Sequence, residues 1–230
     1  MTTSVNANEF YAAYDRSGQG CTLKSKHVRQ FTKDFVDASG YRPGMSVLEL
    51  GCGNGLFLRF LEKIGVTRFM GVDGDSRVLG EMPPDLAAKV RISDFNDFFA
   101  SHPADQKFDR VVMFDVLEHF TAEDGAALLR AIGAVLAPGG RIVIRTPNMG
   151  SPWGMGVQYN DMTHRACYTP GSLRQVAQVG GYRLVAAVPQ AYTSRGRELR
   201  EAVLTTIMGW FLSSPPQIWS PNFIGVLERA

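Results

Sequence analysis

The sequence predicts a doubly wound α/β fold: a seven-stranded sheet, mostly parallel with an antiparallel last strand, and helices on both faces. Short β-rich runs alternate with helical stretches between Ser46 and Thr146, and this alternation is typical of a parallel sheet. A glycine-rich turn follows the first of these runs. Two more β-rich runs lie near the C-terminus, and we expect this final pair to form an antiparallel edge.

The composition predicts one domain without a strong electrostatic field. A chain of 230 residues with 45% hydrophobic residues can bury a full core. We expect a lid or helical prelude over residues 1–44, a main domain over 45–230, and an insertion at about 189–221 before the last strand. Because 24 Lys and Arg balance 22 Asp and Glu, we expect no nucleic-acid partner.

Cysteine usage and apolar runs indicate a cytoplasmic protein. The three cysteines, Cys21, Cys52 and Cys167, lack paired spacing, as expected of reduced thiols. No basic segment followed by an apolar one opens the chain, so we expect no signal peptide. The longest apolar run, 202–212, is shorter than the roughly 20 residues that span a bilayer, so we expect no transmembrane helix.

The elements follow one another in the order that a doubly wound sheet requires. A helix over 23–38 is expected to end at Ser39-Gly40, before the turn at Pro43-Gly44. The strands are expected at Val47–Leu50, 69–72, Val90–Ile92, 110–114, 141–146, 182–188 and 222–228. Further helices are expected at 56–64, after Ser76, at 122–136, at 171–179 and, inside the insertion, at 198–212.

The glycine-rich turn, Gly51-Cys-Gly-Asn-Gly55, lies between the first strand and a helix. Its glycines let the backbone turn sharply and approach a ligand where a Cβ would obstruct it. Open α/β sheets bind ligands at this edge, and the helix N-terminus favours an anionic group. A dinucleotide fingerprint needs G-x-G-x-x-G, whereas this turn reads G-x-G-x-G, which weakens an oxidoreductase interpretation.

Acidic side chains end the next two strands. Asp73 follows the turn by about 20 residues, the spacing at which a carboxylate accepts both ribose hydroxyl protons. Asp94 is expected to accept a hydrogen bond from an adenine amino group, with Phe95 flanking the ring. Taken alone, each Asp would more often be a loop residue or a helix cap.

Over roughly Ser46 to Pro147, this order of elements resembles the class I S-adenosylmethionine-dependent methyltransferases, whose E-x-G-x-G-x-G motif residues 49–55 match. The resemblance implies a Rossmann-like fold and S-adenosylmethionine as cofactor. It implies that Glu49 orders the methionine end of the cofactor, that Asp73 binds ribose and that Asp94 binds adenine. Gly74 stands where many relatives carry an apolar side chain, so we expect packing on adenine to be looser or to be supplied by another residue. The predicted cofactor-binding residues are Glu49, Gly51, Gly53, Asn54, Gly55, Asp73, Asp94, Phe95 and Phe114.

Acidic and imidazole groups follow the fourth strand, whose end is expected to face the transferred methyl group. Asp115, Glu118 and His119 stand at i, i+3 and i+4, so a helix beginning at Asp115 would place them on one face. Methyl transfer needs a nucleophile in line, and an alcohol must also lose its proton. A carboxylate, a histidine or a divalent ion at this position would each serve.

The segment 115–119 resembles the acidic-x-x-Glu-His motif of metal-assisted O-methyltransferases, including those of ubiquinone synthesis and those that modify the terminal ribose of small RNAs. The resemblance implies a metal set of Asp115, Glu118, His119 and His164, and oxygen ligands favour Mg²⁺ or Mn²⁺. Asp115 in place of Glu departs from the motif. Many metal-free members carry Leu-Glu-His here, so His119, His164 and Asp115 stay open as catalytic groups, bases or substrate contacts, without a metal.

The acceptor is expected to be a hydroxyl of a small molecule or glycan. Residues 163–173, 180–182 and 222–226 resemble methyltransferases encoded with bacterial surface-polysaccharide enzymes, which implies a sugar hydroxyl. The alternatives are N- or C-methylation of a small metabolite and cofactor binding without catalysis, because the fold alone selects no substrate.

The insertion and the N-terminus are expected to make further contacts. The insertion helix is expected to wall the substrate pocket or to join two copies in a homodimer, with weak peripheral membrane contact as the alternative. Aromatic and basic residues of the N-terminus are expected to close over the cofactor. The residues concerned are Arg195, Arg197, Arg200, Trp210, Phe211 and Trp219 in the insertion, and Tyr11, Tyr14 and Arg16 at the N-terminus.

Overall fold

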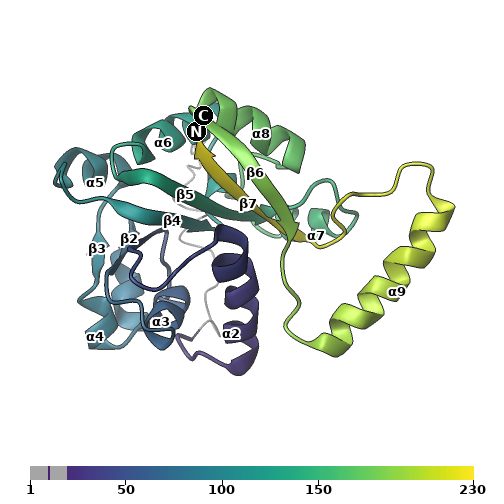
Figure 1. Ribbon diagram of the computed structural model, residues 1–230, viewed down its shortest axis with the longest axis horizontal. Coiled ribbons are helices and arrows are strands. Elements are labelled where there is room, and N and C mark those ends of the chain that lie inside the picture. The colour runs from purple at the N-terminus through teal and green to yellow at the C-terminus, as the bar shows by residue number, and fades with distance from the viewer. Residues whose placement is uncertain (1–9, 11–19) are drawn as a thin grey trace, which may run out of the picture.

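The computed structural model describes Phe10 and residues 20–230, so Tyr11, Tyr14 and Arg16, which are expected to close over the cofactor, lie outside the described residues. Within that part of the chain, seven strands form one sheet in the order β3-β2-β1-β4-β5-β7-β6 (Figure 1). The strands are β1 (Val47–Leu50), β2 (Phe69–Asp73), β3 (Val90–Ile92), β4 (Phe108–Phe114), β5 (Leu136–Pro147), β6 (Tyr182–Pro189) and β7 (Asn222–Arg229). The first five run parallel, and β7 runs antiparallel to both β5 and β6. The predicted fold class is confirmed.

The strand order reverses between β1 and β4. From β1 the chain winds outward through β2 to β3, and it then returns to pair β4 with the other side of β1. Val47 of β1 is aligned with Phe69 on one side and with Arg110 on the other. In open α/β sheets, ligands bind in the crevice outside the carboxyl ends of the strands at such a switch point. The fold therefore places the glycine-rich turn after β1 at the expected binding edge.

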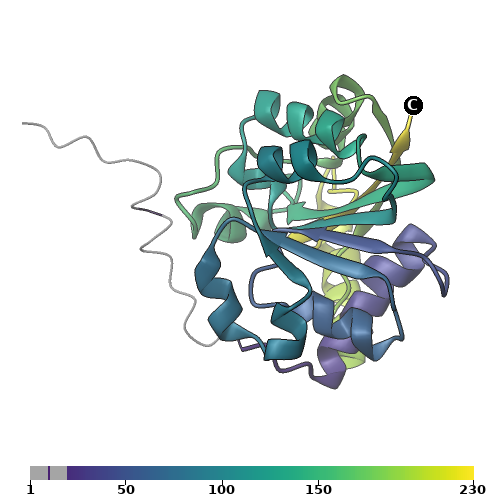
Figure 2. The same cartoon turned by 90° about the vertical axis from the view of Figure 1, so that its left-hand side faces the viewer.

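Helices cover both faces of the sheet (Figures 1 and 2). On one face lie α2 (Ser25–Phe31), α3 (Leu56–Lys63) and α4 (Pro84–Ala87), and on the other lie α5 (Phe95–Ser101), α6 (Ala122–Ile132) and α8 (Pro170–Val179). Successive β4 residues alternate between the two apolar cores, with Val111 and Met113 in one and Val112 and Phe114 in the other. The sheet is therefore buried on both sides, as a parallel sheet requires.

Several element boundaries differ from the prediction. The helix expected over 23–38 forms as α2 followed by a π-helical segment, η1 (Thr32–Asp37). The helix expected over 122–136 ends at Ile132, because Leu136 already pairs with Phe108 in the sheet. Helices α5 and α7 (Gly154–Tyr159) are not predicted by the sequence pattern. The division of the chain at residue 44 stays a prediction.

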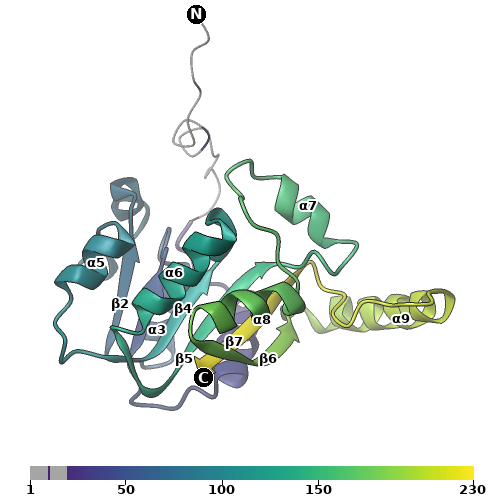
Figure 3. The same ribbon diagram turned by 90° about the horizontal axis from the view of Figure 1, so that it is seen from above.

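Helix α9 (Arg195–Phe211), within the insertion, stands apart from the sheet (Figures 1 and 3). It begins ahead of the expected Glu198 because the Ser194 hydroxyl accepts a hydrogen bond from the Arg197 N–H at 3.2 Å. None of its residues is buried. In the described part of the chain, no helix has the length and apolar character needed to cross a membrane.

Candidate active site

The glycine-rich turn has a backbone that only glycine adopts readily. Gly51, Gly53 and Gly55 have φ of 71°, 49° and 75°. A Cβ on Gly51 would lie 2.5 Å from Cγ2 of Val116, and one on Gly55 would lie 2.9 Å from Cδ2 of Leu86. Side chains are therefore excluded at two of the three positions, and the turn presents bare backbone at the edge of the sheet.

Two buried carboxyl groups flank this turn. Asp73, only 6% exposed, accepts hydrogen bonds from the N–H groups of Gly53 and Asp75, each at 2.9 Å, so it fastens the end of β2 to the turn. Burial raises the pKa of Glu49 well above its ordinary value, and its Oε2 has no hydrogen-bond partner among the described residues. A buried carboxyl group with an unused oxygen fits a cationic donor such as an ammonium group.

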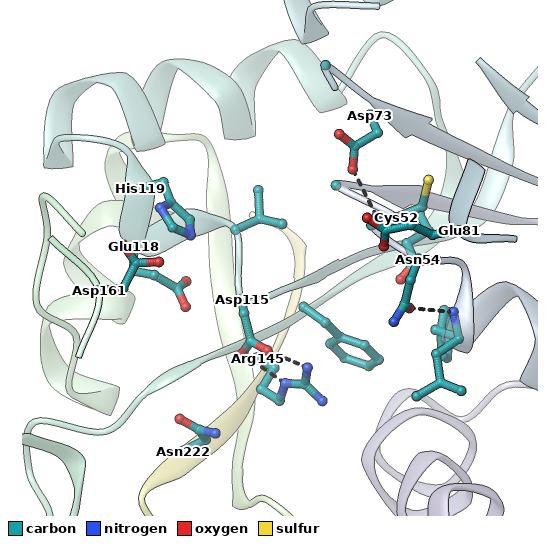
Figure 4. Close-up of a pocket in the computed structure, with 18 of the residues that line it drawn as sticks. Cys52, Asn54, Asp73, Glu81, Asp115, Glu118, His119, Arg145, Asp161 and Asn222 are labelled. Carbon is teal, nitrogen blue, oxygen red and sulfur yellow. Dashed lines mark hydrogen bonds and ion pairs between the residues drawn. The ribbon is translucent and has the colours of Figure 1, made fainter. Parts of the chain in front are cut away.

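A single cleft of about 1230 Å³ runs from the glycine-rich turn to His119 (Figure 4), and His164 also lines it. Every predicted cofactor-binding residue except Gly55 lines it. Sites for one drug-sized ligand usually occupy about 300–1,000 Å³, so this cleft has room for a cofactor and an acceptor together. Lys24, which precedes α2, and His27 and Phe31 within α2 also line it, although no sequence motif marks them.

The predicted adenine end is built from the start of α5. The Asp94 carboxylate caps that helix by accepting from the Asn96 N–H at 2.8 Å, and Phe95 stacks on Phe120 with ring centroids 6.2 Å apart. A Cβ on Gly74 would meet nothing within 4 Å. Asp94 thus serves as the helix cap that the sequence left open as an alternative, while it still lines the cleft.

Asp115 lies at the middle of the cleft in an unusual backbone conformation. With φ of 58°, it is the one non-glycine residue with positive φ in the described chain, and such strain concentrates at functional sites. Its carboxylate forms an ion pair with Arg145, whose Nε donates to Oδ1 at 2.9 Å and whose Nη2 contacts Oδ2 (Figure 4). Arg145 in turn lies 4.7 Å from the centre of the Phe114 ring.

The expectation that Asp115, Glu118 and His119 share a helix face is wrong. The left-handed backbone at Asp115 prevents a helix from starting there, and only a 3₁₀ turn, η3 (Leu117–His119), forms. Glu118 is fully buried although it lines the cleft, and burial raises the pKa of its carboxyl well above the ordinary value. Its backbone carbonyl accepts from the N–H groups of Arg165 and Ala166, which holds the following loop in place.

The loop that follows α7 brings the carboxylate of Asp161 to His119 and His164. One ligand atom each of His119, Asp161 and His164 lies within 4.8 Å of the others, and the two imidazole centroids are 4.7 Å apart. The Thr163 hydroxyl donates to Asp161 Oδ1 at 2.6 Å and lies 2.9 Å from His119 Nδ1. Sequence reasoning missed Asp161 and Thr163, for which the spacing Asp161-x-x-His164 was the available signal.

The hydrogen-bond partners assign a tautomer to each imidazole. Because the Thr163 proton goes to a carboxylate, its oxygen accepts from His119 Nδ1–H, which leaves the lone pair on Nε2. A carbonyl only accepts, so His164 Nδ1 donates to the Gln158 carbonyl at 2.8 Å. Burial, followed by the nearby His164, lowers the pKa of His119, so its neutral form is favoured at physiological pH.

The four predicted metal ligands are not brought together. The ligand atoms close enough together to hold an ion include none from Asp115, which pairs with Arg145, and none from Glu118. His119 and His164 do lie in it, with Asp161 as the acid.

Fold and cleft together define a class of protein. A doubly wound sheet with an antiparallel last strand, bare backbone after β1 and an acid at the end of β2 is the arrangement of class I methyltransferases. The chain belongs to the methyltransferase domain family, whose model matches residues 24–187.

Solved structures share the fold across nearly the whole chain. A SAM-dependent methyltransferase from Archaeoglobus fulgidus superposes with a TM-score of 0.69 at 21% identity, covering 95% of this chain and 99% of that one. The O-methyltransferase NcsB1 of neocarzinostatin biosynthesis, solved with S-adenosylmethionine and 2-hydroxy-5-methyl naphthoic acid, gives 0.57 at 17% identity, covering 89% and 55%.

Curated relatives are similar over a shorter stretch. A ubiquinone biosynthesis O-methyltransferase of Xanthomonas campestris pv. campestris is 29% identical over 120 residues, which is 50% of this chain and 48% of that protein. One from Aeromonas salmonicida is 27% identical over 161 residues, 64% and 66% of the two chains. The chain thus spans about half to two thirds of the length of these relatives, which are named for ubiquinone and not for polysaccharide synthesis.

Proposed function

We propose that the protein methylates a phenolic hydroxyl of a small molecule, with His119 as the base that removes the hydroxyl proton. The observation that carries this proposal is the hydrogen-bond chain from Asp161 through Thr163 to His119 Nδ1. It fixes the imidazole in the tautomer whose Nε2 accepts a proton, and the carboxylate stabilises the imidazolium that forms. The names of the curated relatives, O-methyltransferases, support an oxygen acceptor.

The cofactor end of the cleft fits S-adenosylmethionine. The glycine-rich turn offers backbone where side chains are excluded, the Asp73 carboxylate lies at the end of β2, and Glu49 has an unused buried oxygen. Asp73 would bind the ribose, and Glu49 would bind the methionine ammonium group. When bound, the cofactor supplies an electrophilic methyl group on its sulfonium.

The acidity of the acceptor favours a phenol. A phenol of pKa about 10 and an imidazole of about 6.5 differ by roughly 3.5 units, or about 5 kcal/mol. An alcohol with a pKa near the roughly 15.7 of water raises the gap to about 12 kcal/mol. Because the pKa of His119 is lowered, His119 without a metal ion is better matched to the hydroxyl of a phenol than to that of an alcohol.

A second candidate function is metal-assisted methylation of a sugar hydroxyl. It is favoured by the cluster of His119, Asp161 and His164, which offers three ligand atoms within 4.8 Å of one another. Both imidazoles engage oxygen atoms through Nδ1, as metal-binding histidines usually do. A divalent ion held there would lower the pKa of an alcohol enough for proton loss near neutral pH.

Methyl-labelled S-adenosylmethionine and a panel of phenols, nucleotide sugars and amines, followed by mass spectrometry, test both candidates. The first predicts an O-methylated phenol whose formation is unaffected by EDTA. A methylated sugar that is lost with EDTA and restored by Mg²⁺ or Mn²⁺ would establish the second. An N- or C-methylated product would refute both, and so would S-adenosylhomocysteine binding without turnover on any acceptor.

A further inference from the structure

The apolar face of α9 points away from the rest of the protein. Glu198, Glu201, Thr205 and Met208 are half-buried and follow 3-4-3 spacing, so they form the face toward the body. Leu199, Val203, Ile207 and Trp210 follow 4-4-3 spacing on the opposite face, and all are exposed. Trp210 and Phe211 are 82% and 83% exposed, and large apolar patches of this kind mark interaction surfaces.

All charged residues of α9 lie at its N-terminal end, where three arginines outnumber Glu198 and Glu201. Arg195, Arg197 and Arg200 lie in its first two turns, and Arg195 and Arg200 make no ion pair within the described chain. No charged residue occurs from Ala202 to Leu227. We call the N-terminal end of α9, which carries these arginines, its root. The C-terminal end, its tip, is free of charge and carries the aromatic side chains Trp210 and Phe211.

The root is fastened to the wall of the cleft. Glu198 forms ion pairs with Arg29 and Lys33, on α2 and η1, the lysine contact measuring 2.9 Å. Lys24 and Lys26, at the other end of α2, are exposed and add positive charge beside the cleft. The N-terminal end of α9 therefore lies against the basic helix that forms one wall of the cleft.

We infer that α9 binds the surface of an anionic phospholipid bilayer. The apolar face with Trp210 and Phe211 enters the headgroup boundary, and the arginines of the root contact anionic headgroups. A second copy of the chain fits this pattern less well. Antiparallel pairing of two α9 helices would place Arg195 and Arg200 against the charge-free tip, and parallel pairing would place arginine against arginine.

Sedimentation of the full chain with vesicles tests this inference. We expect binding to vesicles of equal parts phosphatidylcholine and phosphatidylglycerol, little binding to phosphatidylcholine alone, and weakening by added salt. The double variant Trp210→Ser, Phe211→Ser should lower the partition coefficient by about tenfold or more. Val179→Ser, which removes an exposed apolar side chain from α8, is the matched control and should bind like the wild type.

Charge reversal gives an independent readout. Arg195→Glu with Arg200→Glu should abolish the preference for anionic vesicles without changing S-adenosylhomocysteine binding, which shows that the variant is folded. Wild-type protein that fails to bind anionic vesicles would overturn the inference. A dimer in light scattering that the Trp210 and Phe211 double variant abolishes would overturn it too, because a second copy would then cover the helix.

Discussion

Replacing Thr163 with Val tests the proposed base most directly, because it removes the hydroxyl between Asp161 and His119 and keeps the shape of the side chain. Thr163 Oγ1 lies 2.6 Å from Asp161 Oδ1 and 2.9 Å from His119 Nδ1. A hydrogen bond to a charged group contributes about 1.5–3 kcal/mol. Because each 1.36 kcal/mol on the barrier is tenfold in rate, kcat should fall roughly 10- to 150-fold.

Initial rates with the identified acceptor measure this effect. Thr163→Ser keeps the hydroxyl and should retain most of the activity, and S-adenosylhomocysteine affinity should stay unchanged because Thr163 does not line the cleft. A wild-type kcat in Thr163→Val, or an equal loss of cofactor affinity, would refute the reasoning.

The pH profile reports on the same base. Since burial lowers the pKa of His119, kcat/KM should rise with pH and reach half its plateau below about pH 6.5. The Asp161 carboxylate raises that pKa, so Asp161→Asn should move the acid limb to lower pH while the plateau falls. A limb that stays in place would contradict the assignment of His119 as the base.

Three further predictions concern the cofactor end and the strained residue. Gly51→Ala should destabilise the protein by about 2 kcal/mol or more in urea unfolding, because φ is 71° and the new Cβ meets Val116 at 2.5 Å; Val116→Ala in the same chain should recover part of the loss. Asp73→Ala should weaken S-adenosylhomocysteine binding in calorimetry by at least about tenfold, because a buried charged acceptor is lost. Asp115→Gly should be more stable than Asp115→Ala by about 1 kcal/mol, because both lose the ion pair with Arg145 but only glycine relieves the positive φ; equal stabilities would show that the backbone is unstrained.

The cofactor end of the cleft was predictable because its signals are local. Strand ends, glycines and acids follow one another at short spacings, and parallel strands bring their carboxyl ends to one edge. Asp73 therefore reaches Gly53 as soon as β1 and β2 pair in register. Helix α5 is an exception at this end: the sequence marks Asp94 as a possible helix cap, but its pattern does not predict the helix that follows.

The acceptor end was predictable only in part, because a loop and not a strand end completes it. His164 was selected through a resemblance, but its neighbours Asp161 and Thr163 reach His119 across more than 40 positions of the chain. The loop is placed there by the Glu118 carbonyl, which accepts from two of its N–H groups. No periodicity in the sequence encodes that contact.

The spacing from Asp115 to His119 led to a wrong prediction because it is compatible both with a helix and with a left-handed residue followed by a 3₁₀ turn. In a helix the positions i, i+3 and i+4 share a face, whereas a left-handed residue at i turns the next residues elsewhere. Arg145, near the end of β5, holds the Asp115 carboxylate in the observed position, because β4 and β5 pair in register and place Arg145 beside Asp115. An acid held by such an arginine is charge-paired already, which makes it a poorer metal ligand than the acidic-x-x-Glu-His spacing suggests. We therefore propose that the base or metal chemistry belongs to Asp161, His119 and His164 and not to Asp115.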